Sequence, residues 1–337
     1  EYTDTNALWL YDTKDKKYVE KVFHDPKFDF SNPRQGYSDG YILQDRINKV
    51  NYGLSYYAEQ RKYVYWDETY GYLRESVQAT FPDDQVGMYA SSDFSKVIIT
   101  TSSDKSPGSA YFYDVLEGGI VQVAEYAPWL KDYELGDMIP FDFTSRDGLD
   151  LTGYITLPPD YKKGQKIPFI LHPHGGPNAK DRFGYNPEVQ IYATRGYGVI
   201  QVNYRGSVGF GLEKMKLANK QWSLKMHDDL LDALEWANQK GFVNMNKVCI
   251  SGASYGGYSA MVGITKNSDI FKCAINYVGV VDLYTLYDDK QWMFADMGRP
   301  QQHIEMGDPE TERDILENAS PINLSLIHIS EPTRPTP

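Results

Sequence analysis

The sequence contains few cysteines, few histidines and no long apolar run. Among its 337 residues there are only two cysteines, Cys249 and Cys273, and six histidines. Both cysteines lie in apolar, strand-like stretches, so we expect two buried free thiols rather than a disulfide, a metal site or a catalytic cysteine. No apolar run approaches the ~20 residues that a membrane-spanning helix needs, and we expect no membrane span.

Positive charge is also scarce. Lys and Arg number 34 against 46 Asp and Glu, which gives a formal net charge of -12 at pH 7. Phosphate contacts require clustered Lys and Arg, so this balance argues against nucleic acid as a partner. His172 and His174 share one strand without an obvious third ligand, so we expect a structural role for them, no metal and no cofactor.

The amino-terminal part alternates short aromatic strands with polar turns. Three of its segments resemble one another, at residues 8–12 (LWLYD), 63–67 (YVYWD) and 111–114 (YFYD). Successive segments are roughly fifty residues apart, which is the length of a four-stranded propeller blade. We expect residues 1–135 to be a partial β-propeller domain whose earlier blades lie upstream. A generic β-meander is the alternative.

From residue 136 the pattern changes to apolar strands alternating with helices. A hairpin comes first, with Asp147 and Gly148 at its turn. Buried-type strands follow near residues 167–172 and 198–203, and residues 224–240 form an amphipathic helix that ends before Gly241. The apolar stripe of this helix consists of Leu230, Leu231, Leu234 and Ala237. Alternation of this kind predicts a doubly wound α/β sheet.

Residues 252–256 (GASYG) fit the G-x-S-x-G pattern of a nucleophile elbow. They follow a predicted strand and precede a predicted helix, which is the context that such an elbow requires. The elbow forces its serine into strained backbone angles, so the flanking positions must be small. Ser254 is therefore the candidate catalytic nucleophile.

A second glycine-rich segment, residues 174–177 (HGGP), closes an earlier strand. Enzymes with a nucleophile elbow place the second donor of the oxyanion hole at this position. We expect the backbone N–H groups of Tyr255 and Gly176 to bind the oxyanion. One such donor typically contributes about 2.7–4 kcal/mol to transition-state stabilisation.

Four segments together resemble the prolyl oligopeptidase family, in particular its acylaminoacyl peptidase and dipeptidyl peptidase branches. They are residues 172–177 (HPHGGP), 201–211 (QVNYRGSVGFG), 221–236 (QWSLKMHDDLLDALEW) and 249–260 (CISGASYGGYSA). The resemblance implies an α/β-hydrolase domain preceded by the last blades of a β-propeller. It also implies a serine peptidase that acts on short peptides.

The acid and the base of a Ser-His-Asp triad are not evident. In α/β-hydrolases the acid follows the serine and the histidine comes last, yet only His303 and His328 follow Ser254. His303 lies in a loop-like stretch and is the remaining candidate for the base. Asp282 closes a strand and is either the acid or, more simply, a helix cap.

The last residues, 324–337, have no strand or helix periodicity. Residues 324–334 match the translation of a laboratory transposon adapter without a mismatch, and such segments are excluded from fold reasoning. We therefore expect a hydrolase domain at residues 136–323 that is cut before its last strands. On this interpretation the triad acid and base are missing, and the chain as written is inactive.

Three functions fit these features. The leading one is a serine peptidase that forms an acyl-enzyme on Ser254. The alternatives are a carboxylic-ester hydrolase and a non-catalytic propeller–hydrolase scaffold, because fold does not fix function. Tyr284, Tyr287 and Trp292 follow the strand after the elbow, and they either line a substrate pocket or belong to the core. The sequence does not predict the oligomeric state.

Overall fold

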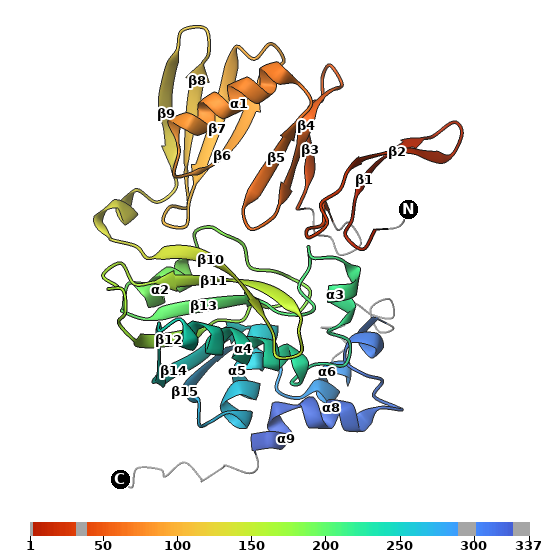
Figure 1. Ribbon diagram of the computed structural model, residues 1–337, viewed down its shortest axis with the longest axis vertical. Coiled ribbons are helices and arrows are strands. Elements are labelled where there is room, and N and C mark those ends of the chain that lie inside the picture. The colour runs from red at the N-terminus through yellow and green to blue at the C-terminus, as the bar shows by residue number, and fades with distance from the viewer. Residues whose placement is uncertain (1–2, 32–38, 289–300, 326–337) are drawn as a thin grey trace.

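The computed structural model describes residues 3–31, 39–288 and 301–325 of the chain. Its strands form three small antiparallel sheets and one larger mixed sheet, with the small sheets stacked above the mixed one in Figure 1. None of the helices in these residues is long and apolar enough to cross a membrane.

The small sheets make up the amino-terminal part. They have two, three and four strands, and consecutive strands pair antiparallel, as in propeller blades. Helix α1 (Glu68–Thr80) joins the second sheet to the third, and its Tyr70, Leu73 and Val77 pack into a shared core. The strands are β1 (Leu8–Asp12), β2 (Lys17–Phe23), β3 (Tyr41–Asp45), β4 (Val50–Tyr57), β5 (Arg61–Tyr65), β6 (Gln85–Ala90), β7 (Lys96–Ser102), β8 (Ser109–Asp114) and β9 (Gly119–Glu125).

Two of the three sequence repeats are equivalent in the structure. Asp12 and Asp114 end β1 and β8 and accept backbone N–H groups in the hairpin turn that follows. Asp67 instead caps helix α1 by accepting from the Tyr70 N–H. The segment that does match the pair is β3, because Asp45 accepts the Ile47 N–H in a hairpin turn. Asp begins turns and helices alike, so the sequence could not distinguish them.

The mixed sheet has the strand order β10-β11-β13-β12-β14-β15. The first three strands are antiparallel neighbours, whereas β13, β12, β14 and β15 run parallel. The predicted hairpin turn at Asp147 and Gly148 joins the first two strands. Their bounds are β10 (Asp137–Thr144), β11 (Asp150–Leu157), β12 (Ile167–Leu171), β13 (Gly198–Asn203), β14 (Val243–Ala253) and β15 (Phe271–Tyr277).

Helices cover both faces of this sheet, as the alternation of strands and helices predicted. Phe169 and Leu171 of β12 face a core that includes Leu230 and Leu234 of α4. Ile170 points to the opposite face, where Val189 of α2 packs. The helices are α2 (Pro187–Ala193), α3 (Leu212–Lys216), α4 (Lys225–Gln239), α5 (Tyr255–Lys266), α6 (Leu283–Asp288), α8 (Arg313–Ala319) and α9 (Pro321–Ser325), and η2 (Pro128–Asp132) is a 3-10 turn.

The expectation of two buried free thiols is wrong. Cys249 and Cys273 are register partners on the adjacent parallel strands β14 and β15, and they form a disulfide with a Cα–Cα distance of 4.8 Å. That distance lies within the range that disulfide geometry allows. Cys273 is exposed and Cys249 is half-buried. Strand register decides this pairing, and register is not visible in the sequence.

The loop after the HGGP segment contacts the amino-terminal sheets. Asp39 forms ion pairs with Lys180 and Arg182, each at 2.6 Å. The Tyr57 hydroxyl donates to the carbonyl oxygen of Phe183 over 2.7 Å. These contacts hold the two parts of the chain together beside the loop that carries the candidate oxyanion donor.

Candidate functional site

Ser254 lies between strand β14 and helix α5 in a strained conformation. Its backbone angles are φ 56 and ψ -120, which few residues other than glycine adopt. The Ser254 N–H donates to the Tyr277 carbonyl of β15 over 2.9 Å, and its carbonyl accepts the Tyr258 N–H. Strain at a residue held this firmly is typical of functional sites.

The glycines around Ser254 are required by close backbone contacts. A Cβ atom on Gly252 would lie 2.6 Å from the carbonyl carbon of Gly256, and one on Gly256 would lie 2.1 Å from the Pro173 oxygen. Both distances are shorter than real Cβ contacts. Only glycine at these two positions allows the backbones of β14, α5 and the segment at Pro173 to pack this closely.

The HGGP segment lies directly against this elbow. A Cβ atom on Gly175 would be 3.2 Å from the Ala253 oxygen and 3.4 Å from Ser254 Cβ. The next residue, Gly176, is exposed and has φ +129, a value that favours glycine. The structure therefore brings Gly176 and Ser254, far apart in the sequence, to the same place.

His174 fixes the peptide group between Gly175 and Gly176. Its Nδ1 lies 2.7 Å from the Gly175 carbonyl oxygen, and since a carbonyl only accepts, Nδ1 carries the proton. Burial lowers the pKa of His174 to about 4, so the ring is neutral at pH 7. The carbonyl and N–H of a trans peptide point in opposite directions. The bond to His174 thereby sets the direction of the Gly176 N–H.

A tyrosine and a serine on the turn after β13 hold the His174 ring. Tyr204 is fully buried and stacks on the imidazole at a centroid distance of 4.4 Å, and its hydroxyl donates to the His174 carbonyl over 2.9 Å. Ser207 Oγ lies 3.0 Å from Nε2, where it donates to the unprotonated nitrogen. This arrangement agrees with the structural role expected for His174.

Tyr255 is the first residue of α5, which begins directly after Ser254. A helix leaves the N–H groups of its first turn without intrahelical partners, so the Tyr255 N–H is available to a ligand at the elbow. The Tyr255 side chain is 4% exposed and packs between Tyr204 and Trp222. Packing of this side chain fixes the start of the helix.

The histidines in the described part of the chain contact groups other than Ser254. His24 bonds to Thr5 and His227 bonds to Asn267, each at 2.8 Å, while His303 lies 3.5 Å from Asp308. His172 packs edge-on against the Tyr192 ring. No three His, Cys, Asp or Glu side chains within the described residues form a group that would hold a metal ion.

Asp282 is a helix cap. Its Oδ1 accepts the N–H groups of Tyr284 and Thr285 at 2.9 and 3.2 Å, at the start of α6. These bonds are those of an N-cap, and they account for an aspartate at this position without a catalytic role. The simpler of the two interpretations of Asp282 is therefore the one that the structure supports.

The three candidate pocket aromatics have different surroundings. Tyr287 is 8% exposed, belongs to the core of the mixed sheet, and donates its hydroxyl to the Gly307 carbonyl over 2.7 Å. Tyr284 is half-buried beneath the Arg313 guanidinium. Trp292 lies outside the described residues. A pocket role for these residues stays a prediction.

A strained serine between a parallel strand and a helix, with a glycine-rich loop beside it, defines an α/β-hydrolase. Residues 183–325 match the model of the prolyl oligopeptidase family. This match agrees with the resemblance to the prolyl oligopeptidase family that the four sequence segments carry.

Known proteins of similar sequence are named as peptidases. Dipeptidyl aminopeptidase BIII of Pseudoxanthomonas mexicana is 36% identical over 244 residues, a match that covers 71% of this chain and 35% of the relative. Dipeptidyl peptidase family member 6 of Caenorhabditis elegans is 36% identical over 214 residues, which cover 58% of this chain and 29% of the relative. The chain thus spans about a third of the length of these relatives.

Solved structures share the fold at lower identity. An acylaminoacyl peptidase of Pyrococcus horikoshii superposes with a TM-score of 0.60 at 24% identity, over 81% of this chain and 40% of that one. Dipeptidyl peptidase 4 of Porphyromonas gingivalis gives a TM-score of 0.61 at 17% identity, over 95% of this chain and 43% of that one. The fold is thus an α/β-hydrolase preceded by propeller blades.

Proposed function

We propose that Ser254 is the nucleophile of a serine peptidase that cleaves short peptides through an acyl-enzyme. The observation that carries this proposal is the strained elbow at Ser254 with the HGGP loop packed against it. The names of the dipeptidyl aminopeptidase and dipeptidyl peptidase relatives support a peptide substrate.

The Gly176 and Tyr255 N–H groups form the oxyanion hole of this proposal. Gly176 lies in the exposed loop beside the serine, and Tyr255 supplies an N–H from the first turn of α5. Donors that are fixed in advance act on the charge that develops in the transition state, so each contributes about 2.7–4 kcal/mol. The His174 bond to the Gly175 carbonyl supplies that fixed direction for Gly176.

In this proposal, none of the residues that the structure describes serves as the acid or the base for Ser254. The described histidines bond elsewhere, and Asp282 caps α6. Without a base the serine hydroxyl keeps its ordinary high pKa and is a poor nucleophile. Residues 324–337 are interpreted as adapter-derived and contribute neither group.

Labelling with a fluorophosphonate tests this proposal. We expect no labelling of the present chain, and no cleavage of chromogenic dipeptidyl or aminoacyl substrates. Residues 1–323, extended with the carboxyl-terminal segment of the bacterial dipeptidyl aminopeptidase relative, should gain both. Ser254→Ala in the extended chain should lower kcat by about 10⁶-fold.

Two results would contradict parts of the proposal. Labelling of the unextended chain that disappears on His303→Ala would identify His303 as the base. Cleavage of p-nitrophenyl esters by the extended chain, without cleavage of any peptide substrate, would favour the ester hydrolase alternative.

Substrate preference in this proposal depends on Tyr284 more than on Tyr287. The Tyr287 ring lies in the core with its hydroxyl already bonded, whereas Tyr284 is half-buried on α6. Tyr284→Ala in the extended chain should therefore change the relative kcat/KM among peptides that differ before the scissile bond.

A further inference from the structure

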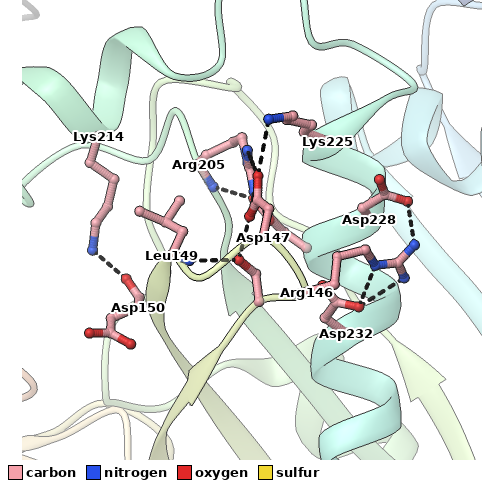
Figure 2. A network of polar contacts seen from close by, with 11 residues as sticks. Arg146, Asp147, Leu149, Asp150, Arg205, Lys214, Lys225, Asp228 and Asp232 are labelled. Atoms are coloured by element: carbon pink, nitrogen blue, oxygen red, sulfur yellow. Dashed lines mark hydrogen bonds and ion pairs between the residues drawn. The ribbon is translucent and has the colours of Figure 1, made fainter.

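Arg205 joins three elements of the hydrolase domain through a polar cluster, in which Arg205 and Asp229 are buried and Asp147 is exposed (Figure 2). Its guanidinium makes paired bonds to Asp229 of α4, at 2.8 and 2.7 Å, and to Asp147 of the β10–β11 turn, at 2.9 and 2.8 Å. The Arg205 N–H also donates to Asp229 over 2.9 Å. The side chains of Arg205 and Asp229 are 3% and 0% exposed.

This cluster is rigid for geometric reasons. A planar guanidinium that holds two carboxylates bidentately has little freedom to rotate. The bonds from Arg205 hold the pKa of Asp147 well below its usual range. Removing one partner would leave a buried charge uncompensated, which is strongly unfavourable.

Arg205 lies inside the turn that holds His174. The turn is closed by the Ser207 N–H, which donates to the Tyr204 carbonyl over 3.0 Å, and it passes through Gly206 at φ +95. Tyr204 and Ser207, on either side of Arg205, both bond His174. Arg205, which anchors the turn, therefore lies between Tyr204 and Ser207, which contact the imidazole of His174.

We propose that Arg205 is a positioning residue for the oxyanion loop. By anchoring the turn of residues 204–207 to Asp229 and Asp147, it holds His174, and His174 aims the Gly176 N–H. The Gly176 assignment rests on the proposed function. The anchoring of His174 is a property of the fold alone.

A second arginine provides a matched control. Arg146 also ties the β10–β11 turn to α4, through bonds to Asp232 and Asp228 at 2.8 and 2.9 Å. It has no bond to the turn of residues 204–207, and Figure 2 shows the two clusters side by side. The Arg146 side chain is 52% exposed and that of Arg205 is 3% exposed, so Arg146→Lys controls for the tie between the hairpin and α4 and not for the burial of Arg205. Positioning of His174 belongs to Arg205 alone.

NMR of the histidine rings tests the proposal in the chain as it exists. The chain has only six histidines, so ¹⁵N-histidine labelling gives few signals, and His174→Gln assigns the one of interest. In the unmodified chain we expect a single neutral tautomer of His174 with the proton on Nδ1. Arg205→Lys should bring tautomer exchange at His174 and raise its pKa from about 4 toward 6.5. Arg146→Lys should leave the His174 signal unchanged.

Two NMR results would overturn the proposal. One is an unchanged His174 signal in a folded Arg205→Lys chain, and the other is an equal change in both lysine variants. Asp147→Asn keeps the Arg205–Asp229 pair and serves if Arg205→Lys does not fold. Asp147→Asn should bring less tautomer exchange at His174 than Arg205→Lys, and a smaller rise in the His174 pKa. An unchanged His174 signal in Asp147→Asn would also contradict the proposal.

Enzyme kinetics of the extended chain give a second test of the role proposed for Arg205. An interaction that acts only in the transition state changes kcat rather than KM. Arg205→Lys should lower kcat by about 10-fold to 100-fold, which is less than the about 10²–10³-fold loss typical when one oxyanion donor is removed completely, and it should change KM by less than about twofold. An equal loss for Arg146→Lys would overturn the positioning role. If the extended chain has no activity at all, the proposed function fails while the NMR arm still decides the anchoring.

Discussion

The two sides of Ser254 differ in how completely they are packed. On the side of the HGGP loop, Tyr204 and Ser207 are fully buried and Tyr255 is 4% exposed. On the other side lies β15, whose Ile275 and Tyr277 are 47% and 68% exposed. In the described part of the chain, β15 pairs only with β14 and forms one edge of the mixed sheet.

This difference shows which groups the fold fixes by itself. Stacking and hydrogen bonds fix the residues that hold the candidate oxyanion donors, which lie in the segments after β12 and β13 and at the start of α5. The serine backbone is tied to the open side as well, through the bond from the Ser254 N–H to Tyr277. The packed side should therefore carry most of the stability, and the open side should tolerate substitution.

The largest effect is expected from Phe169→Ala on the packed side. Phe169 is fully buried in β12, and its ring fills the space above Gly198, where a Cβ atom would be 2.3 Å from the ring. Truncation should leave a cavity and lower the free energy of unfolding by about 3–5 kcal/mol. Urea denaturation followed by circular dichroism measures this loss.

Tyr277→Ala on β15 is the control for Phe169→Ala. Its exposed ring contributes little burial, so the change should be within about 0.5 kcal/mol. Similar losses in the two variants would mean that the two sides of the serine do not differ as described.

The next effect concerns pH and lies in the loop that follows the HGGP segment. Burial raises the pKa of Asp181 to about 7, and its Oδ2 has no hydrogen-bond partner among the described residues. Between about pH 4 and pH 7, Asp181 keeps its proton in the folded chain and releases it in the unfolded chain. The contribution of Asp181 to the free energy of unfolding therefore falls as the pH rises through this range. Asp181→Asn should therefore be more stable than the unmodified chain at pH 8, by about 1–3 kcal/mol.

The difference between the two chains is the quantity to measure, because His174 titrates in the opposite sense. Its lowered pKa makes stability increase with pH between about 4 and 6.5 in both chains. The gain from Asp181→Asn should grow from pH 4 to pH 7 and then level off. A gain that is independent of pH would show that Asp181 is ionised throughout.

The parts of the site that the sequence revealed are those with a local pattern. A strand, a glycine-flanked serine and a helix are contiguous, so the elbow at Ser254 could be predicted. The helix over residues 225–239 followed in the same way from its apolar spacing. The sequence predicts Asp147 only as a turn residue, because its pairing with Arg205 joins segments 58 positions apart.

Other features depend on contacts between distant segments or on register. The Cys249–Cys273 disulfide follows from strand register, and Tyr287 is buried in the same core cluster as Met306 and Leu316, which come later in the chain. For Asp282, by contrast, the sequence already allows a helix cap as one of two interpretations, the other being the triad acid. Local patterns locate the nucleophile, whereas tertiary contacts decide what surrounds it.

The smallest change in stability is expected at the β15 edge, where association is the more sensitive measurement. An exposed edge strand with apolar side chains pairs readily with another chain, and a lysine on such a strand opposes this pairing. Ile275→Lys should change the free energy of unfolding by less than about 0.5 kcal/mol, but reduce self-association seen by sedimentation velocity. Ile98→Lys is the matched control, because Ile98 is 41% exposed on β7, which is paired on both sides by β6 and β8. If both lysines reduce self-association equally, net charge rather than the open edge of β15 causes it, and the contrast between the two sides of Ser254 has no consequence for association.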